Sequence, residues 1–324
     1  MSSPQAIGID IGGTKILAVR ASATGEILQT VRRDTPQDSV DHLVVMLTEL
    51  VAALRHDSVG AVGMGLPGMV DALTGALTFA PGLSFTAAPL RALMQYQLNL
   101  PVITDNDANA AAWAEYRLGA GAGMDNSVLV TLGTGLGCGM ILNGRVFHGR
   151  YGHAAEVSHL LLDPDGPPCT CGKNGCWGVV ATGAAINRLG RVAAATDSTS
   201  KIAMLLADDL AAGEAVTAAA QQGDAQALAI LHYVGDMLGQ GLASLANMLD
   251  PSIMIVGGGP IAAGELLLAP ARKSFACWLY AADRRPPVPI VEASFGVTAG
   301  AVGAALLALD SVNISTKAPP PGQK

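Results

Sequence analysis

The chain has 324 residues, of which 50% are hydrophobic and 14% charged, and its formal net charge is −7 at pH 7. This length and apolar content predict a globular protein large enough for two domains. Without a basic patch or a run of Lys and Arg, nucleic acid is not expected as a partner. Mean hydropathy is +0.40, yet no apolar run reaches bilayer length and no secretion signal is visible, so we expect a cytoplasmic protein without membrane contact.

Strands and helices alternate along the chain in two similar halves. In the first half we predict a strand meander, a helix, two further strands and a helix over residues 6–33, 39–56, 60–68, 101–106 and 107–119. In the second half we predict a strand pair, a helical region, a strand, a helix, a strand and a final helix over 127–142, 179–250, 252–259, 264–278, 289–294 and the residues after Gly300. This alternation predicts an α/β protein with two lobes and a cleft between them.

The boundaries of these lobes are less sharply marked than the elements. We expect a first lobe over residues 1–119 and a second lobe over 120–310, with a hinge near 105–125. An irregular excursion over about 150–178 belongs to the second lobe. Residues 311–324 carry no packing pattern and predict a frayed tail.

The most specific pattern in the sequence is a histidine followed by three clustered cysteines. One imidazole nitrogen and three thiolate sulfurs make the closed four-coordinate shell that structural Zn²⁺ prefers, so this metal would shape a site without performing chemistry. The chain has five cysteines, and this clustering favours metal binding in a reducing compartment over a disulfide framework. The expected ligands are His159, Cys169, Cys171 and Cys176, whereas Cys138 and Cys277 are expected to be small buried hydrophobic residues.

Three glycine turns follow apolar strands. Glycines let backbone N–H groups approach phosphate oxygens, and threonine hydroxyls add donors. Each turn alone is typical of a hairpin or a strand cap, but three of them, two with Asp, Thr or Lys nearby, favour a nucleotide. The carboxylate of Asp10 is placed to hold Mg²⁺, directly or through water. The residues expected on the nucleotide side are Asp10, Gly12, Gly13, Thr14, Lys15, Thr134, Gly135, Gly257, Gly258 and Gly259.

Two familiar nucleotide motifs do not apply. The Walker A motif requires Gly-Lys followed by Ser or Thr, whereas this chain has Thr14 before Lys15. The run from Gly63 to Gly68 matches GxGxxG after a strand, but the segment that follows contains turn signals and no helical pattern. A dinucleotide-binding fold is therefore not predicted there.

Asp105, Asn106 and Asp107 join a predicted strand to a predicted helix. Because Asn and Asp are preferred N-caps, one member is expected to cap the helix. The functional interpretation is that Asp107 accepts the proton of a substrate hydroxyl while Asn106 hydrogen-bonds a neighbouring hydroxyl. Phosphoryl transfer needs little more than such a base, together with positioning and charge stabilisation around the phosphates.

Over roughly residues 6–310 the chain resembles the ROK (repressor, open reading frame, kinase) family, which carries these motifs in the same order. DIGGTK, DNDANAAAWAE, LGTGLG, the H-x9-C-x-C-x4-C spacing and IVGGG carry the resemblance. It implies the ribonuclease H-like fold of actin-like ATPases and hexokinases, and ATP-dependent phosphorylation of a hexose at its 6-hydroxyl. Repressor members begin with a helix-turn-helix domain, which is not expected here because the sequence starts at the first strand. Homodimers are common in the family, and one is expected here.

The resemblance also implies roles at matching positions. Asp107 matches the catalytic base and Asn106 a contact to a sugar hydroxyl. Glu156 matches a glutamate that binds sugar hydroxyls, and Gly65 would bring the backbone close to the sugar. His159 matches a residue that ligates zinc through one ring nitrogen and meets the sugar with the other, because metal coordination fixes the direction of the ring.

Three positions depart from the family pattern. Gly178 stands where a glutamate is usual, Ser158 replaces the glycine before the zinc histidine, and Gly82 replaces an asparagine that contacts the sugar near its 3-position. A lost partner costs about 1–3 kcal/mol when the other group stays unsatisfied, so the sugar pocket is expected to differ. The alternatives are an ordinary glucokinase with a repaired pocket, a kinase for N-acetylmannosamine, N-acetylglucosamine or an amino sugar such as kanosamine, and a non-catalytic sugar sensor. The intact Asp107 and phosphate turns favour an active hexose kinase, with kanosamine as the sharper prediction.

Overall fold

The computed structural model describes residues 3–80, 87–207 and 210–317. Within it the chain forms two compact units. Unit 1 comprises Met1–Asp125, Gly139–Ala155 and Ser294–Lys324, and unit 2 comprises Asn126–Cys138 and Glu156–Ala293. Beyond the expected hinge, two segments expected in the second lobe belong to unit 1 instead, namely residues 139–155 and the C-terminal residues from 294. The C-terminal segment returns to unit 1 because the last helix packs on the first sheet.

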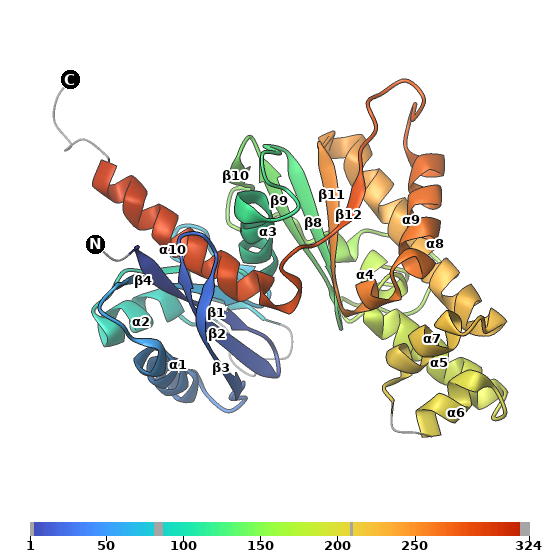
Figure 1. Ribbon diagram of the computed structural model, residues 1–324, viewed down its shortest axis with the longest axis horizontal. Coiled ribbons are helices and arrows are strands. Elements are labelled where there is room, and N and C mark those ends of the chain that lie inside the picture. The colour runs from blue at the N-terminus through green and yellow to red at the C-terminus, as the bar shows by residue number, and fades with distance from the viewer. Residues whose placement is uncertain (1–2, 81–86, 208–209, 318–324) are drawn as a thin grey trace. The chain divides into compact units, whose positions relative to one another are not determined.

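Unit 1 is built around a five-stranded sheet in the order β3-β2-β1-β4-β7. Its first three strands are antiparallel, and β1, β4 and β7 are parallel. Helices cover both faces, with α1 and α2 over one apolar core and α3 and α10 over the other (Figure 1). The bounds are β1 Gln5–Ile11, β2 Lys15–Ser22, β3 Ile27–Asp34, α1 Val40–Leu54, β4 Val59–Leu66, α2 Leu90–Leu98, β7 Val102–Asn106, α3 Asp107–Leu118 and α10 Ala299–Lys317, with a small pair β5 Met69–Val70 and β6 Leu77–Phe79.

Glycines let α10 lie directly against this sheet. A Cβ atom added at Gly8 or Gly63 would overlap the carbonyl oxygen of Ala301 or Ala304 in the helix. The GxGxxG run from Gly63 to Gly68 lies in β4 and the two residues after it. The short strand β5 follows instead of a helix, as the sequence predicts. Gly63 in this run allows the close packing of α10.

A second five-stranded sheet has the order β10-β9-β8-β11-β12, with β8, β11 and β12 parallel. If the strands of each sheet are numbered along the chain, both sheets have the order 3-2-1-4-5. The repeated order confirms the two similar α/β halves expected from the alternation of elements. The bounds are β8 Ser127–Leu132, β9 Leu136–Leu142, β10 Arg145–Val146, β11 Ile253–Gly258 and β12 Ile290–Glu292.

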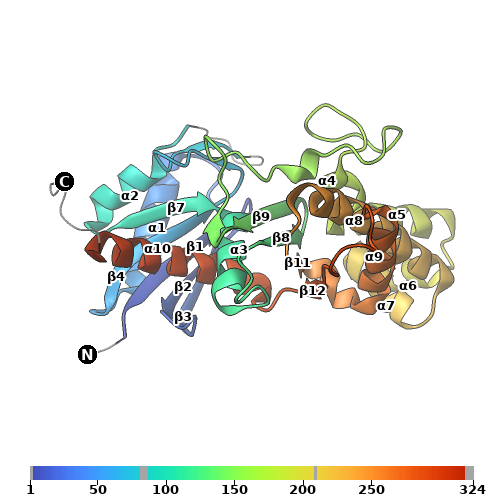
Figure 2. The same ribbon diagram turned by 90° about the horizontal axis from the view of Figure 1, so that it is seen from above.

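Unit 2 also contains most of the helices, with α8 and α9 packed closely side by side (Figure 2). A Cβ atom at Gly239 in α8 would overlap the carbonyl oxygen of Ala271 in α9, so glycine sets this close approach. The bounds are η1 Val157–His159, α4 Trp177–Val180, α5 Gly183–Thr196, α6 Lys201–Ala207, α7 Ala212–Gln221, α8 Ala225–Leu249, η2 Gly259–Ala263, α9 Glu265–Trp278 and, joining unit 1, η3 Gly296–Thr298.

Most expected elements are present within a few residues of their expected bounds, and three expectations need correction. Helix α2 was not predicted from the sequence. The tail expected over 311–324 is helical to Lys317, because α10 continues, and residues 318–324 lie outside the described part. Cys138 is buried as expected, but Cys277 is exposed on α9. Among the described residues, no helix has the length and apolar character needed to cross a membrane.

Candidate functional site

Three parallel strands of unit 1 end at the same edge of the sheet, and the expected catalytic residues lie there. Asp10 of β1 pairs in register with Gly65 of β4, which pairs with Asp105 of β7. Asn106 ends β7 and Asp107 begins α3. The carboxyl edge of a parallel sheet is the usual ligand-binding edge in α/β folds, so the topology brings these residues together.

The Asp10 and Asp107 carboxylates interact across this edge. Gly65 lies between them, since a Cβ atom there would be 3.3 Å from the Cα of Asp107 and 3.7 Å from Oδ1 of Asp10. Burial raises the pKa of Asp10 to about 7, and the negative charge of Asp107 adds to the shift. Two oxygen-bearing groups that repel one another suit a hard cation, because Mg²⁺ prefers carboxylate and phosphate oxygens.

Asn106 is the N-cap of α3, so the capping expectation is confirmed. Its Oδ1 accepts hydrogen bonds from the backbone N–H groups of Ala108 at 2.9 Å and Asn109 at 3.1 Å. Its Nδ2 donates one hydrogen bond to the carbonyl of Gly68 at 3.0 Å. An amide has two N–H donors, so the hydrogen bond to Gly68 leaves the second donor for a ligand.

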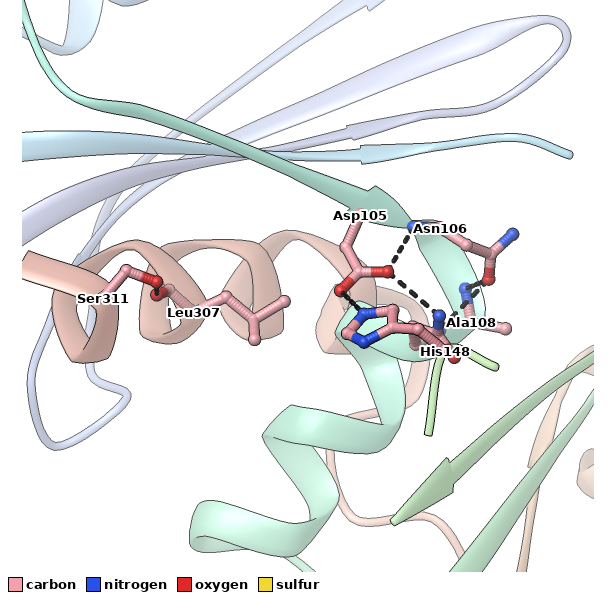
Figure 3. A network of polar contacts seen from close by, with 7 residues as sticks. Asp105, Asn106, Ala108, His148, Leu307 and Ser311 are labelled. Atoms are coloured by element: carbon pink, nitrogen blue, oxygen red, sulfur yellow. Dashed lines mark hydrogen bonds and ion pairs between the residues drawn. The ribbon is translucent and has the colours of Figure 1, made fainter. Parts of the chain in front are cut away.

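A buried polar network supports this turn, and its residues come from distant parts of the chain (Figure 3). His148 Nε2 lies 2.6 Å from Oδ2 of Asp105. Oδ1 of the same carboxylate accepts hydrogen bonds from the backbone N–H of Asn106 at 2.8 Å and from Nδ2 of Asn109 at 2.9 Å. The hydrogen bond to Asp105 raises the pKa of His148 above its usual value. Sequence reasoning missed His148, since a single histidine after a short strand carries no spacing signal.

The first glycine turn is the hairpin between β1 and β2. Gly12 donates its N–H to the carbonyl of Lys15 at 2.9 Å, and Thr35 Oγ1 donates to the carbonyl of Gly12 at 2.7 Å. Gln37 also donates to the carbonyl of Gly13 at 2.5 Å. These bonds fix the backbone of the turn while the side chains of Thr14 and Lys15 stay exposed. The turn is therefore a hairpin, as its local sequence indicates, with two exposed side chains that can donate to phosphate.

The other glycine turns come together within unit 2. Gly258 has a φ of +100° and lies so close to β8 that a Cβ atom would overlap the carbonyl oxygen of Leu132, just before the Gly133–Gly135 turn. The N-terminus of α5 is beside them, because a Cβ atom at Gly183 would lie 3.0 Å from the carbonyl oxygen of Gly133. Sequence reasoning did not single out this helix start. Its free N–H groups and positive dipole end suit an anion.

The expected zinc ligands of unit 2 cluster in space. One ligand atom from each of His159, Cys169, Cys171 and Cys176 lies within 4.8 Å of all the others. Cys171 Sγ is 3.6 Å from Cys176 Sγ, and Cys169 Sγ is 3.6 Å from Nδ1 of His159. Tetrahedral Zn–S bonds place neighbouring sulfurs about 3.7 Å apart, so the residues fit a tetrahedral Zn²⁺ ion.

The thiols of this cluster differ in their surroundings. Burial raises the pKa of Cys176 to about 12, while the backbone N–H of Lys173 lowers the pKa of Cys171. A coordinated zinc ion deprotonates its thiol ligands outright, so both residues suit the same role.

The zinc segment is anchored through Trp177, which follows the last cysteine ligand. This side chain is fully buried, and its Nε1 donates to the carbonyl of Met237 in α8 at 3.1 Å. A Cβ atom at Gly241 would overlap the indole ring. The cluster is therefore tied to the longest helix of unit 2.

Glu156 precedes the zinc histidine by one turn of η1, and the backbone N–H of His159 donates to its carbonyl at 3.3 Å. Its side chain is exposed, and its charge adds to the effect of burial that raises the pKa of Cys138. Two of the departures from the family pattern meet beside it, because a Cβ atom at Gly178 would overlap Oγ of Ser158. The third departure, Gly82, lies outside the described residues.

Two five-stranded sheets with the same strand order define the two-lobed actin-like ATPase fold, which ROK hexokinase structures also have. A model of the ROK family matches residues 6–311, and the chain belongs to this family. The glucokinase of Streptomyces coelicolor is 40% identical over 308 residues, which cover 93% of this chain and 96% of that protein. The N-acetylmannosamine kinase of Yersinia pseudotuberculosis is 33% identical over 316 residues, covering 94% and 99%.

A solved structure gives the same picture. The ROK family glucokinase from Streptomyces griseus, crystallised in complex with glucose and AMPPNP, is 42% identical to this chain. It superimposes with a TM-score of 0.85 and covers 94% of this chain and 99% of that one.

Proposed function

We propose that this protein is a glucokinase that transfers the γ-phosphoryl group of ATP to the 6-hydroxyl of glucose. The broader activity follows from the family and its relatives: the chain is an ATP-dependent sugar kinase. The observation that carries the proposal is the position of Asp107, which begins α3 at the carboxyl edge of the sheet and interacts with Asp10.

In this proposal Asp107 is the general base. The O–H bond of the 6-hydroxyl breaks as its proton passes to the Asp107 carboxylate, the oxygen bonds to the γ-phosphorus, and ADP leaves with the bridging oxygen. A Mg²⁺ ion bound with ATP neutralises charge on the transferring phosphoryl group. Asp10 is the residue of unit 1 that would hold this ion, and the remaining N–H of Asn106 supports a contact to a sugar hydroxyl.

The nucleotide roles are assigned within each unit. In unit 1 we assign phosphate contacts to the hairpin of Gly12, Gly13, Thr14 and Lys15. In unit 2 we assign them to Thr134, Gly135 and Gly257–Gly259, with the N-terminus of α5 added to the set proposed from sequence. The close approach of Gly183 to Gly133 supports that addition, since a helix start and a glycine turn both present N–H groups to an anion.

Zinc is proposed as a structural ion of unit 2. His159 would bind it through Nδ1, the nitrogen that faces Cys169, which leaves Nε2 to contact the sugar. One turn of η1 then sets the position of Glu156, the second sugar contact proposed in this unit. We also propose that the protein is cytoplasmic and that it forms a homodimer. Light scattering coupled to gel filtration would test the homodimer.

A kinase with an altered sugar pocket is the second candidate, supported by the Ser158 and Gly178 contact. Kanosamine is its proposed substrate because Gly82 replaces an asparagine expected near the 3-position of the sugar. The serine hydroxyl occupies the space into which any side chain at position 178 would project. The two departures are therefore one local exchange, in which a hydroxyl replaces a longer acidic side chain. Such an exchange changes which sugar hydroxyls or amino groups find a partner. The glucokinase relatives favour glucose, so glucose stands first.

A coupled ADP-release assay tests these assignments with glucose, glucosamine, kanosamine, N-acetylglucosamine and N-acetylmannosamine. Glucose is expected to give the highest kcat/KM, with NMR showing the phosphate on the 6-oxygen. A higher kcat/KM for kanosamine would make it the substrate instead. Sugar binding by calorimetry without ADP release from any sugar would identify a sensor and overturn the kinase assignment.

A further inference from the structure

We propose that His148 is a positioning residue that acts through Asp105 on the two residues that follow it, Asn106 and Asp107. The inference deepens the proposed function and rests on it, because the effect is expected on the step that Asp107 performs. His148 is 43 residues from Asp105 in the chain, and no motif connects the two.

The contacts around Asp105 show how the effect is transmitted. Asp105 is only 8% exposed, and both of its carboxylate oxygens have partners. Oδ1 accepts hydrogen bonds from the backbone N–H of Asn106 and from the side chain of Asn109, and Oδ2 pairs with Nε2 of His148. The carboxylate thus fixes the turn from β7 into α3 at the residue before the proposed base.

His148 completes this arrangement because it is itself held by backbone contacts. It lies just after β10, where Phe147 donates its N–H to Met140 at 2.8 Å and Ala154 donates to the carbonyl of His148 at 3.2 Å. The imidazole is therefore presented to Asp105 by a fixed backbone. A hydrogen bond between a protonated imidazole and a carboxylate is about twice as strong as a neutral one, and the raised pKa of His148 is consistent with that form.

Loss of this contact has a specific expected consequence. Without His148, one oxygen of a buried carboxylate loses its partner, and the side chain is expected to turn towards solvent. This movement shifts the N–H of Asn106 and the start of α3. A displacement of about 1 Å at a reacting group can cost on the order of 100-fold in rate.

The test compares His148→Ala with His148→Gln, whose amide nitrogen stands near the place of Nε2 and can donate to Asp105. The alanine variant is expected to lower kcat about 10-fold or more and to raise the sugar KM, with the ATP KM unchanged. The glutamine variant is expected to keep kcat and the sugar KM close to their wild-type values. The matched control is His153→Ala, an exposed histidine of the same connection, which should leave all three constants unchanged. If alanine prevents folding, His148→Asn replaces it, because its amide is too short to reach Asp105.

A double-mutant comparison separates positioning from general stability. In an Asp107→Asn background, His148→Ala should cause no further loss of residual turnover, since the group it positions is gone. An equal fold-loss in both backgrounds, or a loss in kcat that glutamine does not restore, would overturn the inference. Wild-type turnover of Asp107→Asn alone would overturn the proposed base, which is a separate result.

Discussion

At the scale of single residues, three carboxylates and one histidine dominate the electrostatics of the proposed site in unit 1. Asp10 and Asp107 repel one another, and Asp105 is paired with His148. The two pairs lie at the carboxyl edge of the sheet, at the ends of β1 and β7, with β4 between these strands. The first pair therefore suits a cation, whereas Asp105 already has His148 as a hydrogen-bonding partner.

The role of Asp107 is tested by Asp107→Asn, which keeps the shape of the side chain and removes the base. We expect kcat to fall by about 10²–10⁴-fold, the usual contribution of a general base. The affinity for sugar, measured by calorimetry, should change little, because Asn106 and the other proposed sugar contacts are retained. Residual turnover within a few-fold of wild type would show that another group accepts the proton.

The His148 and Asp105 pair predicts a pH dependence of stability. Because the hydrogen bond raises the pKa of His148 above its unfolded value of about 6.5, the pair stabilises the fold fully below that pH. The stabilisation is lost as pH rises through the folded pKa. Urea unfolding of wild type and His148→Gln between pH 5.5 and pH 9 should show a free-energy difference that declines with pH. A difference that stays constant would mean that the imidazole does not titrate in this pair.

At the scale of elements, the segment with the proposed zinc ligands is expected to depend on a metal more than on packing. The segment from His159 to Cys176 begins at the last residue of η1 and continues with turns, bends and isolated bridges only. Two of its leucines are exposed, Leu160 at 37% and Leu161 at 61%. Such a segment needs a cross-link or an ion to hold its conformation.

Removing the ion should therefore weaken sugar binding. We expect about one zinc per chain by metal analysis, as four ligands complete one tetrahedral shell. Cys171→Ser should lose the zinc and raise the dissociation constant for glucose about 10-fold or more, because Glu156 and His159 lose their fixed positions. Cys277→Ser, at an exposed thiol outside the cluster, is the control and should keep both. Zinc loss with unchanged sugar affinity would make the cluster a remote structural site.

The packing of α10 on the first sheet is tested by a matched pair of glycine substitutions in β4. Gly63→Ala should destabilise unit 1 by about 1–3 kcal/mol, since the added methyl would overlap the helix backbone at Ala304. Gly60→Ala has no atom within 4 Å of the added carbon and should change stability little. Urea unfolding curves measure both. Equal effects would mean that the α10 contact relaxes without cost.

At the scale of the whole molecule, each of the two units contains some of the proposed binding residues. Unit 1 contains Asp107 and Asp10, and unit 2 contains the zinc cluster and two glycine turns. The chain passes from one unit to the other four times, after residues 125, 138, 155 and 293. Neither unit is therefore a continuous piece of sequence, and the pair is expected to fold as one protein.

Ligands are expected to stabilise this molecule by mass action. At 100 times its dissociation constant, a ligand that binds only the folded state adds about 2.7 kcal/mol. Glucose and the magnesium complex of AMPPNP should each raise the Tm in differential scanning fluorimetry by several degrees. Asp10→Asn should abolish the shift caused by the nucleotide complex and keep the shift caused by glucose. A nucleotide shift that survives this substitution would remove Asp10 from the proposed Mg²⁺ site.

The sequence by itself determined the features that depend on neighbouring residues. The capping by Asn106, the strand and helix alternation, the cluster of one histidine and three cysteines within 18 residues and the rejection of a dinucleotide motif all follow from local spacing and propensity. Only the tertiary structure decided the pairing of His148 with Asp105, the contact of Ser158 with Gly178, and the return of α10 to the first sheet. These contacts join residues 20 to about 300 positions apart, and chain packing rather than local preference brings them together.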